Sequence, residues 1–253
     1  MKRTKSFADF PIPLGGEWLH VEKDVLSEIV NDSSVQIDVE TTSYDSSVDY
    51  ALFEDQQISV EEVGFTIDQK FINSTWFDFF EAYIVPSVAT KIRYNTVVES
   101  IDYAGDQIRV NTVDNEFTAD RVIISVPVKI LQNGMINFTP DLPNDKTEAI
   151  QNVTVWDGCK AFIEFTEKFY PAFVAFDIPS TGEKLYYDAA YGQNTNQNIL
   201  GLFAVGTGTL PYVQLSDTEL IDYMLTELDE IFNGQASANY VKHIFQNWNT
   251  EPF

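Results

Sequence analysis

Three stretches between residues 119 and 171 decide how this chain is interpreted: ADRVIISVPVKILQNG (119–134), FTPDLP (138–143) and WDGCKAFIEFTEKFYP (156–171). The first contains the apolar run Val122–Val126, which is typical of a strand buried on both faces, and Pro127 ends that run. A short helix is expected after the proline. The third stretch alternates from Cys159 to Phe165 and predicts a strand that carries one lysine, Lys160.

Residues 92–127 are predicted to form a three-stranded meander. The alternating runs IRYNTVVESIDYAG and DQIRVNTV are followed by the turn DNE and then by FTADRVIISVP. Ala104-Gly105-Asp106 and Asp114-Asn115 are hairpin turn signals between these runs. The sequence therefore predicts consecutive antiparallel strands that end at Pro127.

Further elements are predicted on either side of the meander. Residues 216–232 give the clearest helix, because Ser216 and Glu219 have the spacing of a capping box and Gly234 follows as a stop signal. Other helices are expected at 24–31, at 74–85 with Ser74 as N-cap and Pro86 after it, and at Lys146–Asn152. Other strands are expected at Leu185–Ala190, Ile199–Val205 and Val241–Phe245, with a weak signal at Val35–Val39.

The order of these elements predicts an α+β fold. A doubly wound domain would need strands and helices that alternate from the start of the chain, and this sequence lacks that alternation. We expect a mixed or antiparallel sheet over residues 128–247, with the helix at 216–232 packed on it. The meander forms a separate part.

Composition restricts the partners of the chain. Lys plus Arg number 15 against 39 Asp plus Glu, which gives a formal net charge of −24. This charge repels phosphate backbones, so nucleic acid is not an expected partner, and it attracts cations such as protonated amines. Solubility, or a salty or cold habitat, would explain the same charge without any ligand.

Several kinds of segment and site are not found in the sequence. Cys159 is the single cysteine, so we expect a buried strand residue and neither an internal disulfide nor a cysteine metal site. The N-terminal MKRTKSFADF lacks the apolar core of a signal peptide, and no run reaches the length of a membrane span. A cytoplasmic protein without membrane contact is the resulting expectation.

The stretches quoted above, together with four others, resemble the flavin-containing amine oxidases, the family of monoamine oxidases, polyamine oxidases and histone lysine demethylases. The others are LGGEWLH (14–20), IRYNTVVESI (92–101), SDTELIDYMLTELDEIFNG (216–234) and QNWNTEPF (246–253). Each motif alone is common, but their order and spacing together are specific. The resemblance implies FAD as cofactor and a small-molecule amine as substrate.

The resemblance also assigns site residues. Lys160 matches the family's lysine, which is implied to hold a water at the flavin as the catalytic group. Gly15 and Gly16 match paired glycines that let the backbone approach the cofactor. Val98 falls where a valine lies by the adenine, and Trp248 matches a tryptophan near the flavin ring. No metal site is implied.

Residue chemistry gives four of these positions a second reading. Lys160 shares a strand face with Phe162, and an apolar surrounding would lower the pKa of its amine so that it could hold a water. The alternative is a surface lysine paired with an acid such as Glu164. Gly15-Gly16 could equally be an ordinary turn, and Trp248 a packed strand-end aromatic.

The chain departs from the family pattern in three places, and the first is the stretch between His20 and Trp76, which is shorter than the helical insertion usual there. The chain contains no Gly-x-Gly-x-x-Gly turn, which in the family sets the pyrophosphate on a helix N-terminus. It also lacks the Gly- and Ser-containing flavin segment expected after Trp248. The expectation is a central, truncated fragment that binds FAD weakly or not at all by itself, with a second chain as a partner that supplies the missing FAD-binding segments.

The resemblance implies a division of the chain. Residues 1–20 are expected to be a remnant of the FAD-binding domain, 21–90 the helical and loop part of the substrate domain, 91–127 the β-meander of the FAD-binding domain, and 128–253 the sheet and helix of the substrate-binding domain. Two functions stay open. One is FAD-dependent oxidation of an amine to an imine, with amino-acid or carotenoid oxidation as variants. The other is a non-catalytic binding module, as a pseudoenzyme or a subunit of a split oxidase.

Overall fold

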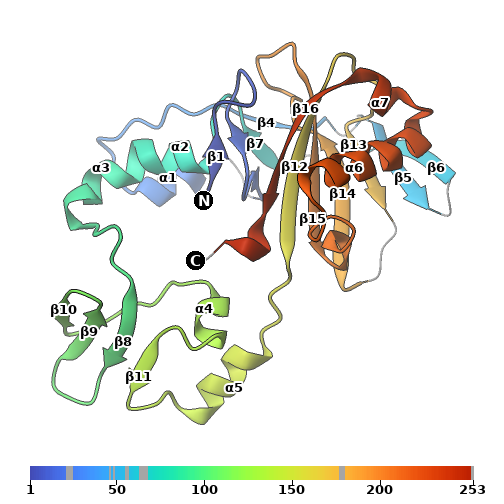
Figure 1. Cartoon of the computed structure of the whole chain (residues 1–253). Coiled ribbons are helices and arrows are strands. Elements are labelled where there is room, and N and C mark those ends of the chain that lie inside the picture. The colour runs from blue at the N-terminus through green and yellow to red at the C-terminus, as the bar shows by residue number, and fades with distance from the viewer. Residues whose placement is uncertain are drawn as a thin grey trace. The chain divides into compact units, whose positions relative to one another are not determined.

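The computed structural model of the chain describes residues 1–20, 25–45, 47, 49–54, 57–62, 68–176 and 180–251 (Figure 1). These residues form two compact units, which we call the sheet unit and the meander unit. The sheet unit contains residues 1–89 and 157–250, and the meander unit contains residues 90–156 with Glu251. Each unit is described by itself.

A seven-stranded sheet organises the sheet unit, in the order β16-β12-β15-β14-β13-β5-β6. Its strands are β5 (Asp49–Glu54), β6 (Gln57–Glu62), β12 (Gly158–Phe165), β13 (Phe173–Phe176), β14 (Gly182–Asp188), β15 (Asn198–Gly206) and β16 (Tyr240–Asn247). All neighbours are antiparallel except β13 and β5, which are parallel. The predicted strands of the C-terminal half are confirmed, and the mixed sheet agrees with the predicted α+β class.

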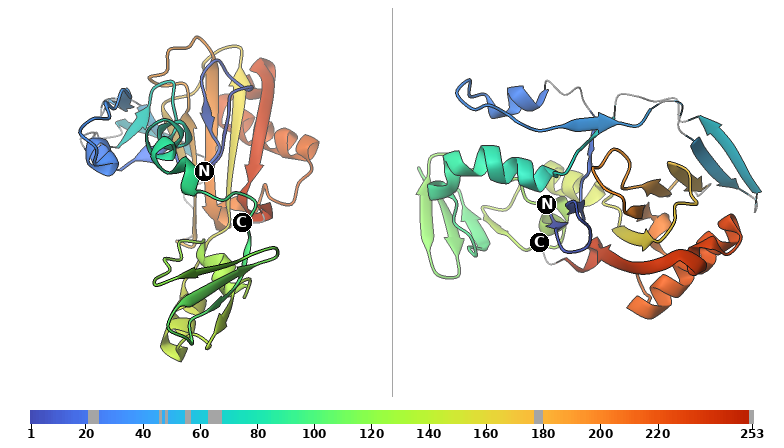
Figure 2. Two further views of the ribbon diagram at one scale, coloured as in Figure 1. Left: turned by 90° about the vertical axis from the view of Figure 1, so that its left-hand side faces the viewer. Right: turned by 90° about the horizontal axis from the view of Figure 1, so that it is seen from above.

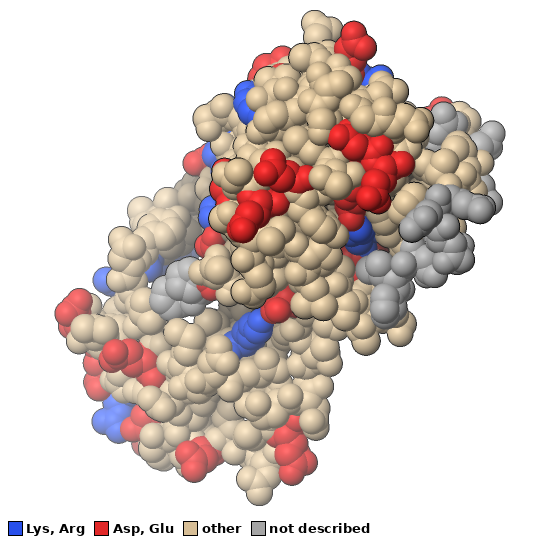
Figure 3. Space-filling view, turned by 45° about the vertical axis from the view of Figure 1, so that its right-hand side comes forward, with Lys and Arg blue, Asp and Glu red and all other residues tan. Residues whose placement is uncertain are grey.

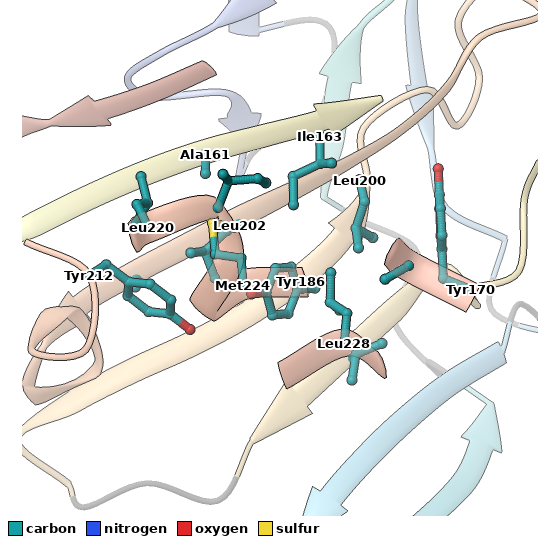
Figure 4. Close-up of a cluster of buried hydrophobic side chains, with 14 of the residues drawn as sticks. Ala161, Ile163, Tyr170, Tyr186, Leu200, Leu202, Tyr212, Leu220, Met224 and Leu228 are labelled. Atoms are coloured by element: carbon teal, nitrogen blue, oxygen red, sulfur yellow. The ribbon is translucent and has the colours of Figure 1, made fainter. Parts of the chain in front are cut away.

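Helix α6 (Asp217–Phe232) covers one face of this sheet, followed by the short α7 (Gln235–Asn239). The predicted capping box of α6 is present, because the Ser216 and Glu219 side chains bond reciprocally to the backbone. Asn233 ends α6 in the left-handed conformation. Leu220, Met224 and Leu228 project from the helix onto strand residues such as those of β12 and β15 (Figure 4). Burying each such side chain stabilises the fold by about 1.5–3 kcal/mol.

The N-terminal segment packs on the opposite face of the sheet (Figure 2). It forms the small pair β1 (Arg3–Thr4) and β2 (Ile12–Pro13), and Ile12 and Leu14 are buried against Phe162 and Ile199 of the sheet. Alternation along β12 explains this division, since Cys159, Ala161 and Ile163 belong to the α6 side. The predicted two faces of this strand are confirmed.

A three-stranded sheet and several helices complete the sheet unit. The elements are β3 (Trp18–Leu19), β7 (Gln69–Phe71), β4 (Thr41–Ser43), α1 (Val25–Val30), α2 (Trp76–Phe79), α3 (Val85–Val88) and a π-helical segment (Phe80–Ile84) that joins α2 to α3. Thr75, not Ser74, caps α2, because its hydroxyl accepts the Asp78 N–H. Pro86 lies in the first turn of α3, where no partner for its missing N–H is needed.

The weak strand signal upstream is wrong. Residues 35–39 are not a strand, and strands form instead at β4, β5 and β6. The β5–β6 hairpin joins the large sheet through parallel pairing with β13, more than 100 residues away in sequence. Local alternation cannot reveal a pairing of that range.

The meander unit contains a four-stranded sheet in the order β10-β9-β8-β11. Its elements are β8 (Val98–Asp102), β9 (Ile108–Thr112), β10 (Glu116–Ala119), β11 (Asn137–Thr139), α4 (Val128–Gln132) and α5 (Asn144–Asn152). The predicted meander of β8, β9 and β10 is confirmed, and β11 adds to β8 in parallel. Residues 128–156 belong to this unit, so the expected boundary after residue 127 does not coincide with a boundary between the units.

The predicted strand at Val122–Val126 is wrong. The segment has no regular structure, and the exposed fractions of the Ile123 and Ile124 side chains are 95% and 40%. A central strand needs neighbours on both edges to satisfy its backbone groups, and no described residue supplies a hydrogen bond to this segment. An apolar run of this kind is buried only where neighbouring strands cover it, and the described residues supply none here.

Acidic side chains gather on the face seen in Figure 3, and few basic side chains accompany them. This distribution agrees with the formal net charge of −24. Within the described residues, no helix is long and apolar enough to cross a membrane. The surface charge therefore favours cationic over anionic ligands in the surrounding solution.

Candidate functional site

A cavity of about 860 Å³ opens on the face of the large sheet opposite to α6. Four of the five predicted site residues line it: Gly15, Gly16, Lys160 and Trp248. They come from three regions of the sequence, and the fold brings them together. Val98, the fifth, lies in β8 of the meander unit, so its place relative to this cavity remains a prediction.

The register of the sheet builds the floor of the cavity. Lys160 on β12 pairs with Phe203 on β15, and Phe203 pairs with Leu185 on β14. One step along, Val205 pairs with Gly158 and with Glu183. Because paired residues of neighbouring strands point to the same side, these rows present a largely apolar surface with Lys160 as its cation.

Lys160 is buried, with 5% of its surface exposed. Its Nζ donates to Glu17 Oε2 at 2.8 Å, to Gly15 O at 3.2 Å and to Pro13 O at 3.3 Å. The ammonium also lies 5.4 Å from the ring centres of Phe162 and Tyr187. The backbone of the Gly15 turn and one carboxylate therefore hold this side chain in place.

These contacts correct one of the two readings of Lys160 taken from the sequence. It is not a surface lysine paired with Glu164, whose carboxylate instead accepts from Gln197 and pairs with Lys242. An ammonium group has three N–H donors, and the three acceptors above satisfy all of them. A neutral Lys160 amine that holds a water therefore requires this arrangement to open.

Tyr187 binds the same carboxylate from the next row of the floor. Its hydroxyl donates to Glu17 Oε2, and burial followed by the charge of Glu17 raises the Tyr187 pKa well above its ordinary value. Gly201 makes room for the ring, because a Cβ atom at that position would lie 2.6 Å from the ring atom Cζ of Tyr187. The pairing of Gly201 with both Phe162 and Tyr187 places this gap beside Lys160.

The paired glycines differ in their surroundings. A Cβ atom on Gly15 would lie 3.2 Å from the ring atom Cζ2 of Trp248, whose Nε1 donates to Leu14 O at 2.8 Å. At Gly16, no atom of the described residues lies within 4 Å of such a Cβ atom. The Trp248 ring thus fills the space beside Gly15, and the space beside Gly16 is free.

A second buried lysine lies behind this turn and was missed from the sequence. Lys70 is 1% exposed, and its Nζ donates to Ala189 O at 2.9 Å and to Asp188 O at 3.5 Å. Burial lowers the Lys70 pKa from 10.5 to about 8, and the charge of Glu17 opposes part of that shift. The short, partly polar strand β7 gave no sequence signal for a buried cation.

The wider surroundings of the cavity include a polar rim. His20 pairs with Asp68 at 3.1 Å, and the exposed Glu183 lies at the end of the floor. Burial raises the pKa of Cys159 to about 12, in agreement with its predicted place in a strand core. Among the described residues no group of His, Cys, Asp and Glu is placed to hold a metal ion.

The lining fits the ring part of a flat aromatic cofactor better than its phosphates. The floor offers Leu185, Phe203 and Val205, and Gly16 leaves an open backbone edge. Its volume lies within the range of small-molecule sites. The described lining residues include no helix N-terminus, which is the usual anchor for a pyrophosphate.

Comparison with known proteins identifies the family. The family model for flavin containing amine oxidoreductases matches residues 80–253, more than half of the chain. The chain belongs to this family, as its motifs predicted. Its members named below act on different substrates, so membership alone does not give the substrate.

Two curated relatives illustrate the range. Lysine-specific histone demethylase 1B of Mus musculus is 28% identical over 169 residues, which are 64% of this chain and 20% of that protein. Polyamine oxidase 1 of Zea mays is 25% identical over 224 residues, 84% of this chain and 44% of that protein. The chain thus spans from a fifth to less than half of the length of these relatives.

Solved structures agree on the fold. A variant of putrescine oxidase superposes with a TM-score of 0.74 at 12% identity, over 95% of this chain and 75% of that one. Cyclohexylamine oxidase from Brevibacterium oxydans gives a TM-score of 0.72 at 11% identity, over 95% and 74%. These likenesses confirm an amine-oxidase fold in the described chain.

Proposed function

We propose that this chain is part of an FAD-dependent oxidase that converts a small-molecule amine to an imine. The observation that carries the proposal is the buried Lys160 on the floor of a cavity that Gly16 and Trp248 also line. Family membership supports the flavin, and the names of the polyamine, putrescine and cyclohexylamine oxidases support an amine substrate.

The residues of the chain would bind and orient the cofactor and the amine, and FAD would oxidise the amine. The chemistry that FAD supplies when bound is acceptance of a hydride from the carbon next to the amine, which leaves an imine that water hydrolyses. Phe203 and Leu185 would exclude water from the reacting atoms, and Trp248 would wall the flavin side. Lys160 is the proposed catalytic residue, as the cation on the floor of the cavity.

A binding test separates the ring contacts from the phosphate contacts. We expect FAD titrated into the 253-residue chain to bind more weakly than about 1 µM, because losing several charge-assisted hydrogen bonds of about 1.5–3 kcal/mol each removes several powers of ten in affinity. Submicromolar affinity would mean that another segment binds the phosphates. Isothermal titration calorimetry measures this directly.

An activity test uses the protein purified from its native gene. The purified protein should show the visible absorbance of oxidised flavin. This absorbance should decrease when an amine is added in the absence of oxygen. A panel of mono-, di- and polyamines, an amino acid and a carotenoid identifies the substrate class. A flavin that none of these compounds reduces would contradict the proposal.

A non-catalytic interaction module is the second candidate, and the meander unit provides its observation. An apolar groove of about 430 Å³ lies between α4, α5 and β11, lined by side chains such as Val128, Leu131 and Ile150. The exposed Ile123 and Ile124 continue the apolar surface. The partner proposed for this surface is a polypeptide that supplies FAD-binding segments.

Cofactor content distinguishes the two candidates. Co-purification of the chain with such a partner, followed by flavin absorbance and amine-dependent bleaching of the complex, supports a split oxidase. A stable complex without flavin supports a pseudoenzyme that binds its partner only. A chain that stays monomeric and carries reducible flavin supports the oxidase without a partner.

A further inference from the structure

We propose that Glu17 is the positioning residue of the cavity, which holds the Lys160 ammonium and the Tyr187 hydroxyl together through one carboxylate oxygen. The inference deepens the proposed function, since it names the group that orients the proposed catalytic lysine. Its structural part does not depend on FAD or on an amine.

The first observation is how Glu17 distributes its two oxygens. Oε2 accepts from Lys160 Nζ at 2.8 Å and from the Tyr187 hydroxyl, and among the described residues no donor is bound to Oε1. Only 8% of the Glu17 surface is exposed, and the residue lines the cavity. An ionised carboxylate buried to this extent requires a counter-ion, which Lys160 provides.

The second observation is that the fold reserves space for this geometry. Glu17 follows directly after Gly15-Gly16, and the Gly15 carbonyl binds the same ammonium, so the turn supplies both the carboxylate and a backbone acceptor. On the opposite side, the missing side chain of Gly201 admits the Tyr187 ring. Glycine residues therefore help to place both neighbours of the Glu17 carboxylate: Gly15 binds the Lys160 ammonium, and Gly201 leaves space for the Tyr187 ring.

The third observation is that removing Glu17 would leave Lys160 among unfavourable neighbours. The charge of Lys70 also acts on this region, because Lys160 contributes to lowering the Lys70 pKa. Without the Glu17 carboxylate, the Lys160 ammonium would keep the carbonyl oxygens of Pro13 and Gly15 as acceptors, and Asp188 would be the carboxylate whose charge still acts on Lys70. The Lys160 ammonium would then lose a proton at a lower pH.

Chemical labelling of lysines tests the inference in the apo chain, because only the unprotonated amine reacts with an acylating reagent. Mass spectrometry would follow the labelling of Lys160 in the native chain and in Glu17→Gln between pH 6 and 10. We expect the pH of half-reaction for Lys160 to fall by at least about one unit in Glu17→Gln, equivalent to tenfold faster labelling at a fixed pH.

The chain offers a matched control in Lys184, which pairs with Glu227 at 2.6 Å on the other face of the same sheet. Glu17→Gln should leave the labelling profile of Lys184 unchanged, and Glu227→Gln should shift Lys184 but not Lys160. A shift of both lysines in either variant would indicate general loosening and would contradict the proposal. An unchanged Lys160 profile in folded Glu17→Gln would also overturn it.

Gly201→Ala tests the same inference without removing any charged side chain. The added methyl group should displace the Tyr187 ring, and Lys160 labelling should increase about two- to fivefold, less than in Glu17→Gln, because one of the two neighbours of the carboxylate moves. If Glu17→Gln fails to fold, Lys160 labelling in Gly201→Ala becomes the test of the inference. No change in labelling there would reject the inference. The outcome is independent of amine oxidation, so a failure of the proposed function would leave it standing.

Discussion

Two buried clusters of the same chemistry lie on opposite faces of one strand, β14. On the cavity face, Lys160 and Tyr187 bind Glu17. On the α6 face, Lys184 binds Glu227 Oε2, and the hydroxyl groups of Tyr186 and Tyr212 donate to Glu227 Oε1. Successive residues of the strand, Tyr186 and Tyr187, point to opposite sides and so serve different clusters.

The difference between them lies in what surrounds the carboxylate. Glu227 has donors on both oxygens, and the Lys184 ammonium lies 3.7 Å from the Phe176 ring centre beneath a helix. Among the described residues, the donors to Glu17 bind one of its oxygens, and the side chain borders a cavity of about 860 Å³. The comparison indicates that the α6 cluster stabilises the fold, whereas the Glu17 cluster leaves acceptor capacity for the cavity.

The largest stability effect is therefore expected on the α6 face. Glu227→Ala leaves a buried ammonium and two tyrosine hydroxyl groups without a partner and should cost about 3–5 kcal/mol of unfolding free energy. Urea denaturation followed by circular dichroism measures this loss. Glu17→Ala should cost less, about 2–3 kcal/mol, because water in the cavity can solvate Lys160. An equal or greater loss for Glu17→Ala would remove the distinction.

Lys70 predicts a pH dependence of stability. Its folded pKa of about 8 lies below the ordinary 10.5, so the unfolded chain binds more protons between these values and unfolding free energy rises with pH there. Relative to Lys70→Met, the native chain should gain about 1.6 kcal/mol of unfolding free energy between pH 8 and pH 9.5. The ionisable tyrosines are common to both proteins and cancel in the difference. A difference that stays constant with pH would refute the burial effect.

The next effect concerns the gap beside Tyr187. Gly201→Ala should destabilise the sheet unit by about 1–3 kcal/mol, since the added methyl group overlaps the tyrosine ring in a packed core. Thermal unfolding would report the loss. Combining Gly201→Ala with Tyr187→Leu should restore part of it, and no recovery in the double variant would argue against a clash with that ring.

The smallest effect distinguishes the two glycines of the turn. Gly15→Ala should cost about 1 kcal/mol because the methyl group presses on Trp248, and Gly16→Ala should change stability by less than about 0.5 kcal/mol. Trp248 fluorescence should shift only in Gly15→Ala. If FAD approaches Gly16, that variant should instead weaken cofactor binding in the holo protein.

Local patterns predicted much of this fold and little of the cluster at its centre. Alternation gave β12, β14, β15 and β16, and the Ser216–Glu219 spacing gave the start of α6. The Lys160–Glu17 pair joins residues 143 positions apart, and no local period encodes such a contact. Resemblance supplied Lys160, but the acid that holds it became visible only in three dimensions.

The error at Val122–Val126 has a related cause. The apolar run predicts burial on both faces, yet burial is a property of the neighbours as much as of the segment. In the meander unit Ile123 remains exposed because the described residues supply no adjacent strand. The composition thus indicated that the segment favours burial, and the structure shows no adjacent strand among the described residues that would bury it.

Rapid kinetics of the flavin in the holo protein, compared between the native form, Lys160→Met and Glu227→Gln, tests the central claim most directly. We predict that Lys160→Met slows flavin reduction by the amine or reoxidation by oxygen at least about tenfold, with the fold intact by circular dichroism. Glu227→Gln, on the opposite face of the sheet, should leave both steps unchanged. Native rates for both half-reactions in Lys160→Met would remove this lysine from the mechanism and contradict the account.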